Sequence, residues 1–162
     1  MWRPGERCLI TPAGMRIAVA SDEWSDVDAV IVRELEGLGY SVWRGGAAAD
    51  RAEHPWVDVA AEAAGRVTGG EADEGILLCW TGTGVCMAAN KLPGIRAALC
   101  ADAQTAAAAR VWNHANVLCL SHRTLTPDLA REILAAWFAP YDRKQGAQGV
   151  ARLEALDQLQ GG

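Results

Sequence analysis

The hydrophobic pattern of this chain alternates between short apolar runs and longer segments with helical spacing. The short runs predict five β-strands, at residues 15–20, 40–43, 74–80, 96–100 and 116–120. The longer segments repeat apolar residues at intervals of three and four, which predicts helices at residues 26–38, 57–67, 85–92, 103–112, 127–138 and 149–159. Residues 45–53 show neither pattern, and we expect a loop there.

This alternation of strands and helices predicts the fold class. Strands that alternate with helices form parallel sheets with helices on both faces. We therefore predict an α/β protein, a three-layer α/β/α sandwich with a five-stranded, Rossmann-like parallel sheet. Residues 1–14 contain two prolines and two glycines and are predicted to be an N-terminal extension. Residues 15–159 are predicted to form one domain, since 162 residues suit a single core.

Composition and charge exclude several classes of partner. The chain carries 15 Lys and Arg against 20 Asp and Glu, a formal net charge of −5. The basic residues form no cluster, so neither nucleic acid nor a membrane is expected as a partner. No apolar run approaches the ~20 residues of a membrane span, no signal peptide is evident, and a cytoplasmic location is expected. The five cysteines and three histidines lack metal-ligand spacing, so we predict no metal site.

Candidate chemistry lies at the end of the third predicted strand. This strand delivers Cys79 to its carboxyl end, and the turn Thr81-Gly82-Thr83-Gly84 then opens a short helix. Backbone N–H groups of such a turn hold negative charge, and local positive potential lowers the pKa of a thiol. These features suit a reaction in which a base removes a proton while an oxyanion develops. A buried structural thiol is the alternative, because cysteine is among the most buried residue types.

The same turn is a poor match to a dinucleotide-binding fingerprint. Gly82 and Gly84 match its first two glycines, but Met87 occupies the position of the third. We therefore predict no cofactor. In parallel α/β proteins ligands bind beyond the carboxyl ends of the strands, which is where Asp22, Cys79 and Asp102 fall.

Three segments carry a resemblance to a known family: residues 69–79 (GGEADEGILLC), 81–84 (TGTG) and 88–100 (AANKLPGIRAALC). With these segments the chain resembles the type B ribose-5-phosphate isomerase and galactose-6-phosphate isomerase family, from about residue 15 to 156. The resemblance implies a Rossmann-like sandwich and a homodimer that shares its active sites, with a C-terminal segment from about Tyr141 reaching toward the partner. It also implies aldose–ketose isomerisation of a small-molecule substrate through an enediolate.

The resemblance assigns roles to particular residues. Cys79 resembles the base, and Thr81 resembles the hydroxyl that assists it. The residues implied to stabilise the enediolate or to contact the substrate are Asp22, Gly82, Thr83, Gly84, Asn90, Asn113 and Arg123.

The chain also departs from the family pattern. Glu23 stands where the family has a phosphate-binding histidine, and Trp112 stands where it has the ring-opening histidine. A pair of phosphate-binding arginines is replaced by Gln145 and Gly149. We expect the pocket to be lined by Glu23, Trp24, His54, Trp80 and Trp112, and three indoles at one mouth favour a flat or apolar ligand.

We therefore predict an isomerase-like enzyme with Cys79 as base and a substrate other than ribose 5-phosphate. Two alternatives stay open. One is a recruited enzyme that transfers a proton next to a carbonyl of an aromatic or apolar metabolite. The other is a dimeric binding protein without catalytic activity.

Overall fold

Within the part of the chain that the structure describes, the sheet is entirely parallel and has five strands. The computed structural model describes residues 14–161, so residues 1–13 of the predicted extension lie outside the described residues. The strand order is β2-β1-β3-β5-β4, and each neighbouring pair is parallel. The strands are β1 (Arg16–Ser21), β2 (Ser41–Gly46), β3 (Glu74–Cys79), β4 (Ala97–Leu99) and β5 (Val117–Ser121). This sheet confirms the predicted α/β class.

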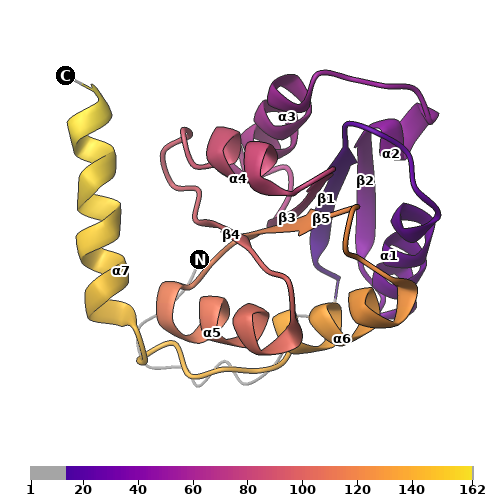
Figure 1. The fold of residues 1–162 in the computed structure, drawn as a ribbon. Coiled ribbons are helices and arrows are strands. Elements are labelled where there is room, and N and C mark those ends of the chain that lie inside the picture. The colour runs from indigo at the N-terminus through magenta and orange to yellow at the C-terminus, as the bar shows by residue number, and fades with distance from the viewer. Residues whose placement is uncertain (1–13, 162) are drawn as a thin grey trace.

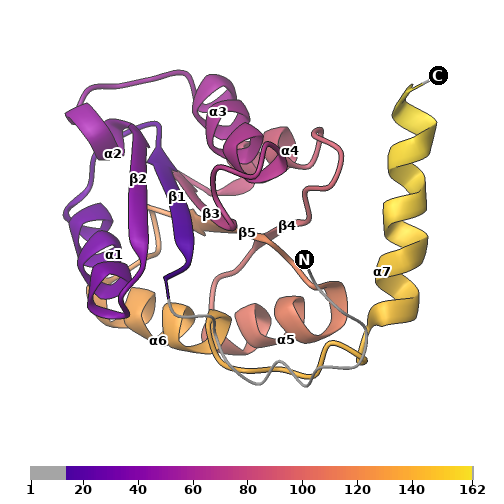
Figure 2. The same ribbon diagram turned by 180° about the vertical axis from the view of Figure 1, so that it is seen from behind.

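Helices cover both faces of the sheet (Figures 1 and 2). They are α1 (Asp26–Gly37), α2 (Ala47–Asp50), α3 (Trp56–Thr68), α4 (Thr83–Ala89), α5 (Ala103–Asn113), α6 (Pro127–Trp137), α7 (Ala147–Glu154) and the 3-10 helix η1 (Ala155–Gly161). The helices α1, α5 and α6 pack on one face, and α3 and α4 pack on the other. The three-layer sandwich is therefore as predicted.

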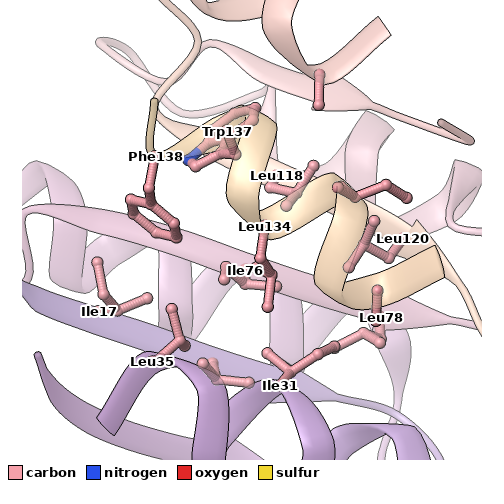
Figure 3. Close-up of a cluster of buried hydrophobic side chains, with 14 of the residues drawn as sticks. Ile17, Ile31, Leu35, Ile76, Leu78, Leu118, Leu120, Leu134, Trp137 and Phe138 are labelled. Atoms are coloured by element: carbon pink, nitrogen blue, oxygen red, sulfur yellow. The ribbon is translucent and has the colours of Figure 1, made fainter. Parts of the chain in front are cut away.

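Two separate cores follow from the alternation of side chains along each strand. Figure 3 shows the core between the sheet and helices α1 and α6. It includes Ile17, Ile31, Leu35, Ile76, Leu78, Leu118, Leu120, Leu134, Trp137 and Phe138. The opposite face packs smaller side chains against α3 and α4, among them Ala18, Ala20, Leu77, Cys79, Val117 and Cys119. Cys79 thus belongs to the α3 and α4 face.

The structure corrects the prediction of a loop over residues 45–53. The strand β2 continues to Gly46 by pairing with β1, and the short helix α2 follows directly. Gly46 has a φ of 55° and lies against the backbone of Ser21, where a side chain has no room. Ala47 and Ala48 are buried, and the left-handed Arg51 ends the helix. Burial of small alanines, rather than an amphipathic pattern, holds this turn of helix in place.

A buried ion pair closes the amino edge of the sheet. The Arg110 guanidinium lies 2.6 Å from a Glu74 carboxylate oxygen, and the Trp137 indole N–H donates to the other oxygen at 2.8 Å. Burial raises the pKa of Glu74, while Arg110 and the Trp137 hydrogen bond oppose that rise. This cluster joins β3, α5 and α6.

The C-terminal helices α7 and η1 extend away from the sheet, beside the end of α5 (Figures 1 and 2). They are tied to the loop before β4 by the Arg96–Glu154 ion pair at 3.2 Å and by the Gly94 N–H, which donates to Asp157 at 2.7 Å. Within residues 14–161 no helix is long and apolar enough to cross a membrane.

Candidate active site

Cys79 and Asp22 lie side by side at the carboxyl edge of the sheet. The register of β1 and β3 pairs Ser21 with Leu78, and the Asp22 N–H donates to the Leu78 carbonyl at 3.4 Å. The next pair along the two strands is therefore Asp22 with Cys79, on strands ~4.8 Å apart. By alternation, both residues follow Ala20 and Leu77 on the α3 and α4 face.

The sulfur of Cys79 accepts a backbone hydrogen bond. Cys79 is only 6% exposed, and the Gly82 N–H donates to its Sγ at 3.2 Å. Gly82 has a φ of 74°, and a Cβ there would lie 2.9 Å from the backbone of Leu120. Glycine is therefore required to bring this N–H onto the sulfur.

The threonines of the turn bond to each other. The Thr81 and Thr83 hydroxyl oxygens lie 2.6 Å apart, and both residues are exposed. The Thr81 hydroxyl thus contacts Thr83 in this arrangement. The first N–H groups of α4 have no acceptor within their own helix, which leaves donors beside Cys79.

Trp56 covers this turn, and the sequence analysis did not place it at the site. A Cβ on Gly84 would lie 3.0 Å from the nearest carbon of the Trp56 indole. Trp56 is the first residue of α3 and remains 43% exposed. A helix that joins two parallel strands begins at the carboxyl edge of the sheet, where the first strand ends. Pro55, which directly precedes Trp56 and is typical of a helix start, was therefore the sequence signal that could have placed Trp56 at this edge.

One oxygen of the Asp22 carboxyl makes no hydrogen bond within the described part of the chain. Its Oδ1 is buried and has no hydrogen-bond partner among the described residues. Burial raises the pKa of Asp22, and the neighbouring Glu23 carboxylate raises it further, whereas His122 opposes the rise. Buried polar atoms are normally paired, so this oxygen has an unused capacity to accept a hydrogen bond.

The other residues near Asp22 come from the loop after β1 and from the loop after α2. The Asp22 carbonyl accepts the His54 N–H at 2.9 Å, and the His54 ring contacts Asp50 at 2.9 Å. The Arg51 guanidinium lies over the Trp24 ring, 4.5 Å from its centre. His54 and Trp24 are therefore held close to the end of β1, as a pocket-lining role requires.

Trp80 and Arg123 follow β3 and β5 at the same edge. The Trp80 carbonyl accepts the Ser121 hydroxyl at 2.8 Å and the Arg123 N–H at 3.0 Å. Trp80 is 58% exposed, and Arg123 is exposed as well. The backbones of Trp80 and Arg123 thus meet at the carboxyl edge of the sheet.

Three predicted site residues do not reach this edge within one chain. Helices α4 and α5 run back from the carboxyl edge to the amino edge, so Asn90, Trp112 and Asn113 lie at their far ends. The Asn90 amide bonds both backbone groups of Ala97, at 2.8 and 2.9 Å. Asn90 therefore fixes β4. Trp112 is 58% exposed, and one chain does not place three indoles at one mouth.

A buried polar network lies beneath the site, and the sequence analysis missed it. The Asp28 carboxylate accepts the Ser21 hydroxyl at 2.7 Å and contacts the His122 Nε2 at 2.7 Å. Asp28 is fully buried, and the His122 side chain is 4% exposed. The signal was a carboxylate on the apolar face of the helix at residues 26–38.

The four described cysteines are free. A hydrogen bond from Cys119 lowers the pKa of Cys86 to about 7. Burial raises the pKa of Cys100 to about 11 and that of Cys119 well above its ordinary value. Within residues 14–161, no group of three or more His, Cys, Asp and Glu side chains is placed to hold a metal ion.

The amino-acid sequence that builds this site matches a known protein family. A sequence profile described as ribose/galactose isomerase matches residues 17–156. The chain belongs to this family. The match confirms the resemblance on which the isomerase prediction rests, and it covers the sheet from the second residue of β1 onward.

Individual relatives agree with the family assignment. Ribose-5-phosphate isomerase B of Escherichia coli is 35% identical over 130 residues, which cover 80% of this chain and 83% of the relative. D-erythrulose-4-phosphate isomerase of Pectobacterium atrosepticum is 48% identical over 86 residues, covering 52% of this chain and 57% of the relative. The solved ribose-5-phosphate isomerase B of Clostridium thermocellum has a TM-score of 0.81 at 32% identity, covering 89% of this chain and 98% of that one. The ribose/galactose isomerase fold and enzyme class are therefore shown.

Proposed function

We propose that this ribose/galactose isomerase family member is an aldose–ketose isomerase of a sugar phosphate, with Cys79 as its base. One observation carries the proposal: Cys79, whose sulfur accepts the Gly82 N–H at 3.2 Å, is by the strand register the neighbour of Asp22, whose buried Oδ1 has no partner among the described residues. A base and a hydrogen-bond acceptor for a sugar hydroxyl thus share one edge of the sheet.

The chemistry follows from these positions. The Cys79 thiolate takes the proton from the carbon next to the substrate carbonyl, and the electron pair moves onto the carbonyl oxygen to give an enediolate. The N–H groups at the start of α4, at Thr83 and Gly84, stabilise that oxyanion. Cys79 then returns the proton to the former carbonyl carbon, and the proton of the adjacent hydroxyl passes to the former carbonyl oxygen, so that the carbonyl now lies on the neighbouring carbon and the reaction is a net isomerisation. Asp22 accepts a substrate hydroxyl, and Arg123 attracts the phosphate.

The substrate that this site favours is an open-chain sugar phosphate. Trp112 stands where the family resemblance has the ring-opening histidine, and an indole cannot act as acid or base there. A tetrose 4-phosphate has no free hydroxyl with which to close a five-membered ring, so its isomerisation needs no ring opening. The choice of a tetrose phosphate over ribose 5-phosphate rests on this chemistry, and two relatives bear the name D-erythrulose-4-phosphate isomerase.

A substrate panel tests this proposal. Purified protein is assayed with D-erythrulose 4-phosphate, ribose 5-phosphate, galactose 6-phosphate and an unphosphorylated tetrulose. We expect the tetrulose phosphate to give the highest kcat/KM, by at least about tenfold. A higher kcat/KM with ribose 5-phosphate contradicts the choice of substrate, and no turnover of any sugar phosphate contradicts the proposed function.

We also propose a homodimer that shares its active sites. Asn113 and Trp112 lie at the opposite sheet edge from Cys79 and can act on substrate only in a second copy of the chain. Large apolar side chains are exposed along α4, β4, α5 and the C-terminal helices: Met87, Leu99, Trp112, Leu153, Leu156 and Leu159. A second copy that covers them buries this surface and supplies the missing residues.

Complementation distinguishes a shared site from a self-contained one. Cys79→Ala and Asn113→Ala are purified separately, mixed in equal amounts and allowed to exchange subunits. In a shared-site dimer, half of the dimers are mixed and each has one intact site, so the mixture regains about a quarter of wild-type activity. No recovery after verified exchange contradicts the shared site.

A further inference from the structure

The indole of Trp56 lies flat against the glycine turn that follows Cys79. A Cβ built on Gly84 would lie 3.0, 3.2 and 3.3 Å from three consecutive ring atoms of Trp56, of which the nearest, Cε3, is the middle one. An approach to the ring edge would leave the two outer atoms much farther away than the middle one, so Gly84 faces the flat side of the ring. Trp56 is nevertheless 43% exposed. The rest of its surface therefore stays open beside the turn.

The closeness of this indole explains why residue 84 is a glycine. Gly84 is the second residue of α4 and does not have a positive φ, so its backbone conformation would suit any residue. Glycine makes a helix less stable than alanine does. A Cβ at 3.0 Å from a ring carbon, however, is closer than ordinary van der Waals contact between carbons. The absence of a side chain at Gly84 thus lets the Trp56 ring pack on the first turn of α4.

The segment that carries Trp56 is also tied to the end of β1. The His54 N–H donates to the Asp22 carbonyl at 2.9 Å. Pro55, whose ring restricts the backbone, then begins α3 with a φ of −58°. Helices α3 and α4 lie side by side on one face of the sheet (Figures 1 and 2). Residues 54–56 therefore pass from Asp22 to the first turn of α4, and the indole is held at both ends of this path.

We propose that Trp56 is a specificity-determining residue that limits the carbon chain length of the sugar phosphate. The inference rests on the proposed function, which assigns the enediolate oxygen to the N–H groups of Thr83 and Gly84. An indole packed on Gly84 takes up room beside those donors. A rigid aromatic side chain in that place discriminates by steric exclusion. A four-carbon substrate fits beside the ring, whereas a further carbon meets it.

The test compares two ketose phosphates that differ by one carbon, D-erythrulose 4-phosphate and D-ribulose 5-phosphate. Neither has a free hydroxyl that could close a five-membered ring, so the comparison does not depend on ring opening. The measured quantity is the ratio of kcat/KM for the four-carbon to the five-carbon compound. We expect wild type to favour the four-carbon compound. In Trp56→Ala this ratio falls at least about tenfold, since one carbon group in a confined site changes kcat/KM by roughly 10–200-fold.

Trp43→Ala is the matched control. Trp43 lies on β2 and also packs on α3, with the Arg66 guanidinium 4.0 Å from the centre of its ring. Its removal loosens the same helix without touching the glycine turn, so the ratio stays at the wild-type value. An equal loss of kcat/KM for both compounds in Trp56→Ala overturns the proposal, and so does an equal fall of the ratio in Trp43→Ala. If Trp56→Ala does not fold, Trp56→Leu takes its place, with a ratio expected to move in the same direction.

A binding measurement separates this inference from the proposed function. Calorimetric titration of Cys79→Ala, with and without the further change Trp56→Ala, gives the Kd of both ketose phosphates without turnover. We expect the further change to tighten binding of the five-carbon compound relative to the four-carbon one. That shift, combined with no turnover of either compound by wild type, contradicts the proposed function alone. Turnover by wild type with unchanged ratios of kcat/KM and Kd in the Trp56 variants contradicts the role of Trp56 alone, and absence of binding of both compounds contradicts both.

Discussion

Asp22→Asn is expected to stabilise the fold while it impairs the enzyme. The wild-type carboxyl has a buried Oδ1 without a partner among the described residues, and a buried polar group left unpaired costs ~1–3 kcal/mol. Asp22 is partly exposed, so we take the low end, ~1 kcal/mol. A neutral amide is much less costly to bury than a carboxylate. The free energy of unfolding of Asp22→Asn is therefore expected to be ~1 kcal/mol higher at pH 7. For a chain of this size, that difference corresponds to a rise of ~2–4 °C in Tm.

The pH dependence of this gain follows from linkage. Burial raises the pKa of Asp22 in the folded state, so the unfolded chain ionises first and the fold loses stability as pH rises above the ordinary aspartate value. The gain of Asp22→Asn is therefore absent at the lowest pH and grows as the pH rises above the ordinary aspartate value. Urea unfolding at several pH values measures it. Asp128→Asn is the control, since its side chain is 92% exposed. A destabilised Asp22→Asn, or a gain independent of pH, refutes this reasoning.

Three further predictions concern the turn, the amino edge and the thiols. Gly82→Ala forces a side chain into a left-handed backbone against β5, so unfolding free energy falls by more than ~2 kcal/mol and activity is lost; a stable, active variant contradicts this. Arg110→Met removes the cation from the buried Glu74 carboxylate, which keeps the Trp137 N–H, and costs ~3–5 kcal/mol at pH 7. Denaturant titration should show a smaller loss at acidic pH, where Glu74, its pKa raised by burial, takes up a proton. Iodoacetamide at pH 7.5 should label Cys86, with a pKa of about 7, before Cys119; mass spectrometry reports the order.

The fold was predictable because each strand and helix carries its own pattern. The β3 strand is a continuous buried run, and the helix at residues 26–38 shows a clear apolar face. The prediction failed at α2, whose alanines give no amphipathic signal and whose position depends on β2 pairing with β1 through Gly46. The position of Cys79 and the glycine turn followed from local sequence, since strand, turn and helix start are contiguous.

The rest of the site depends on residues far apart in the chain. Asp28 and His122 are 94 residues apart, and one sequence contains no sign that they meet. Trp56 reaches Gly84 only because α3 and α4 pack together on one face. The placement of Trp112 was accessible in principle, because a helix that joins two parallel strands must return to the amino edge.

Solvent exchange at the substrate carbon tests the base most directly. D-erythrulose 4-phosphate is incubated in deuterium oxide with wild type, Cys79→Ala or Cys86→Ala, and proton NMR follows the signals of the carbons next to the carbonyl. If Cys79 is the base, wild type and Cys86→Ala exchange and isomerise, whereas Cys79→Ala loses at least about a thousandfold in rate and keeps its Tm within a few degrees. Exchange at the wild-type rate by a folded Cys79→Ala protein would contradict the account.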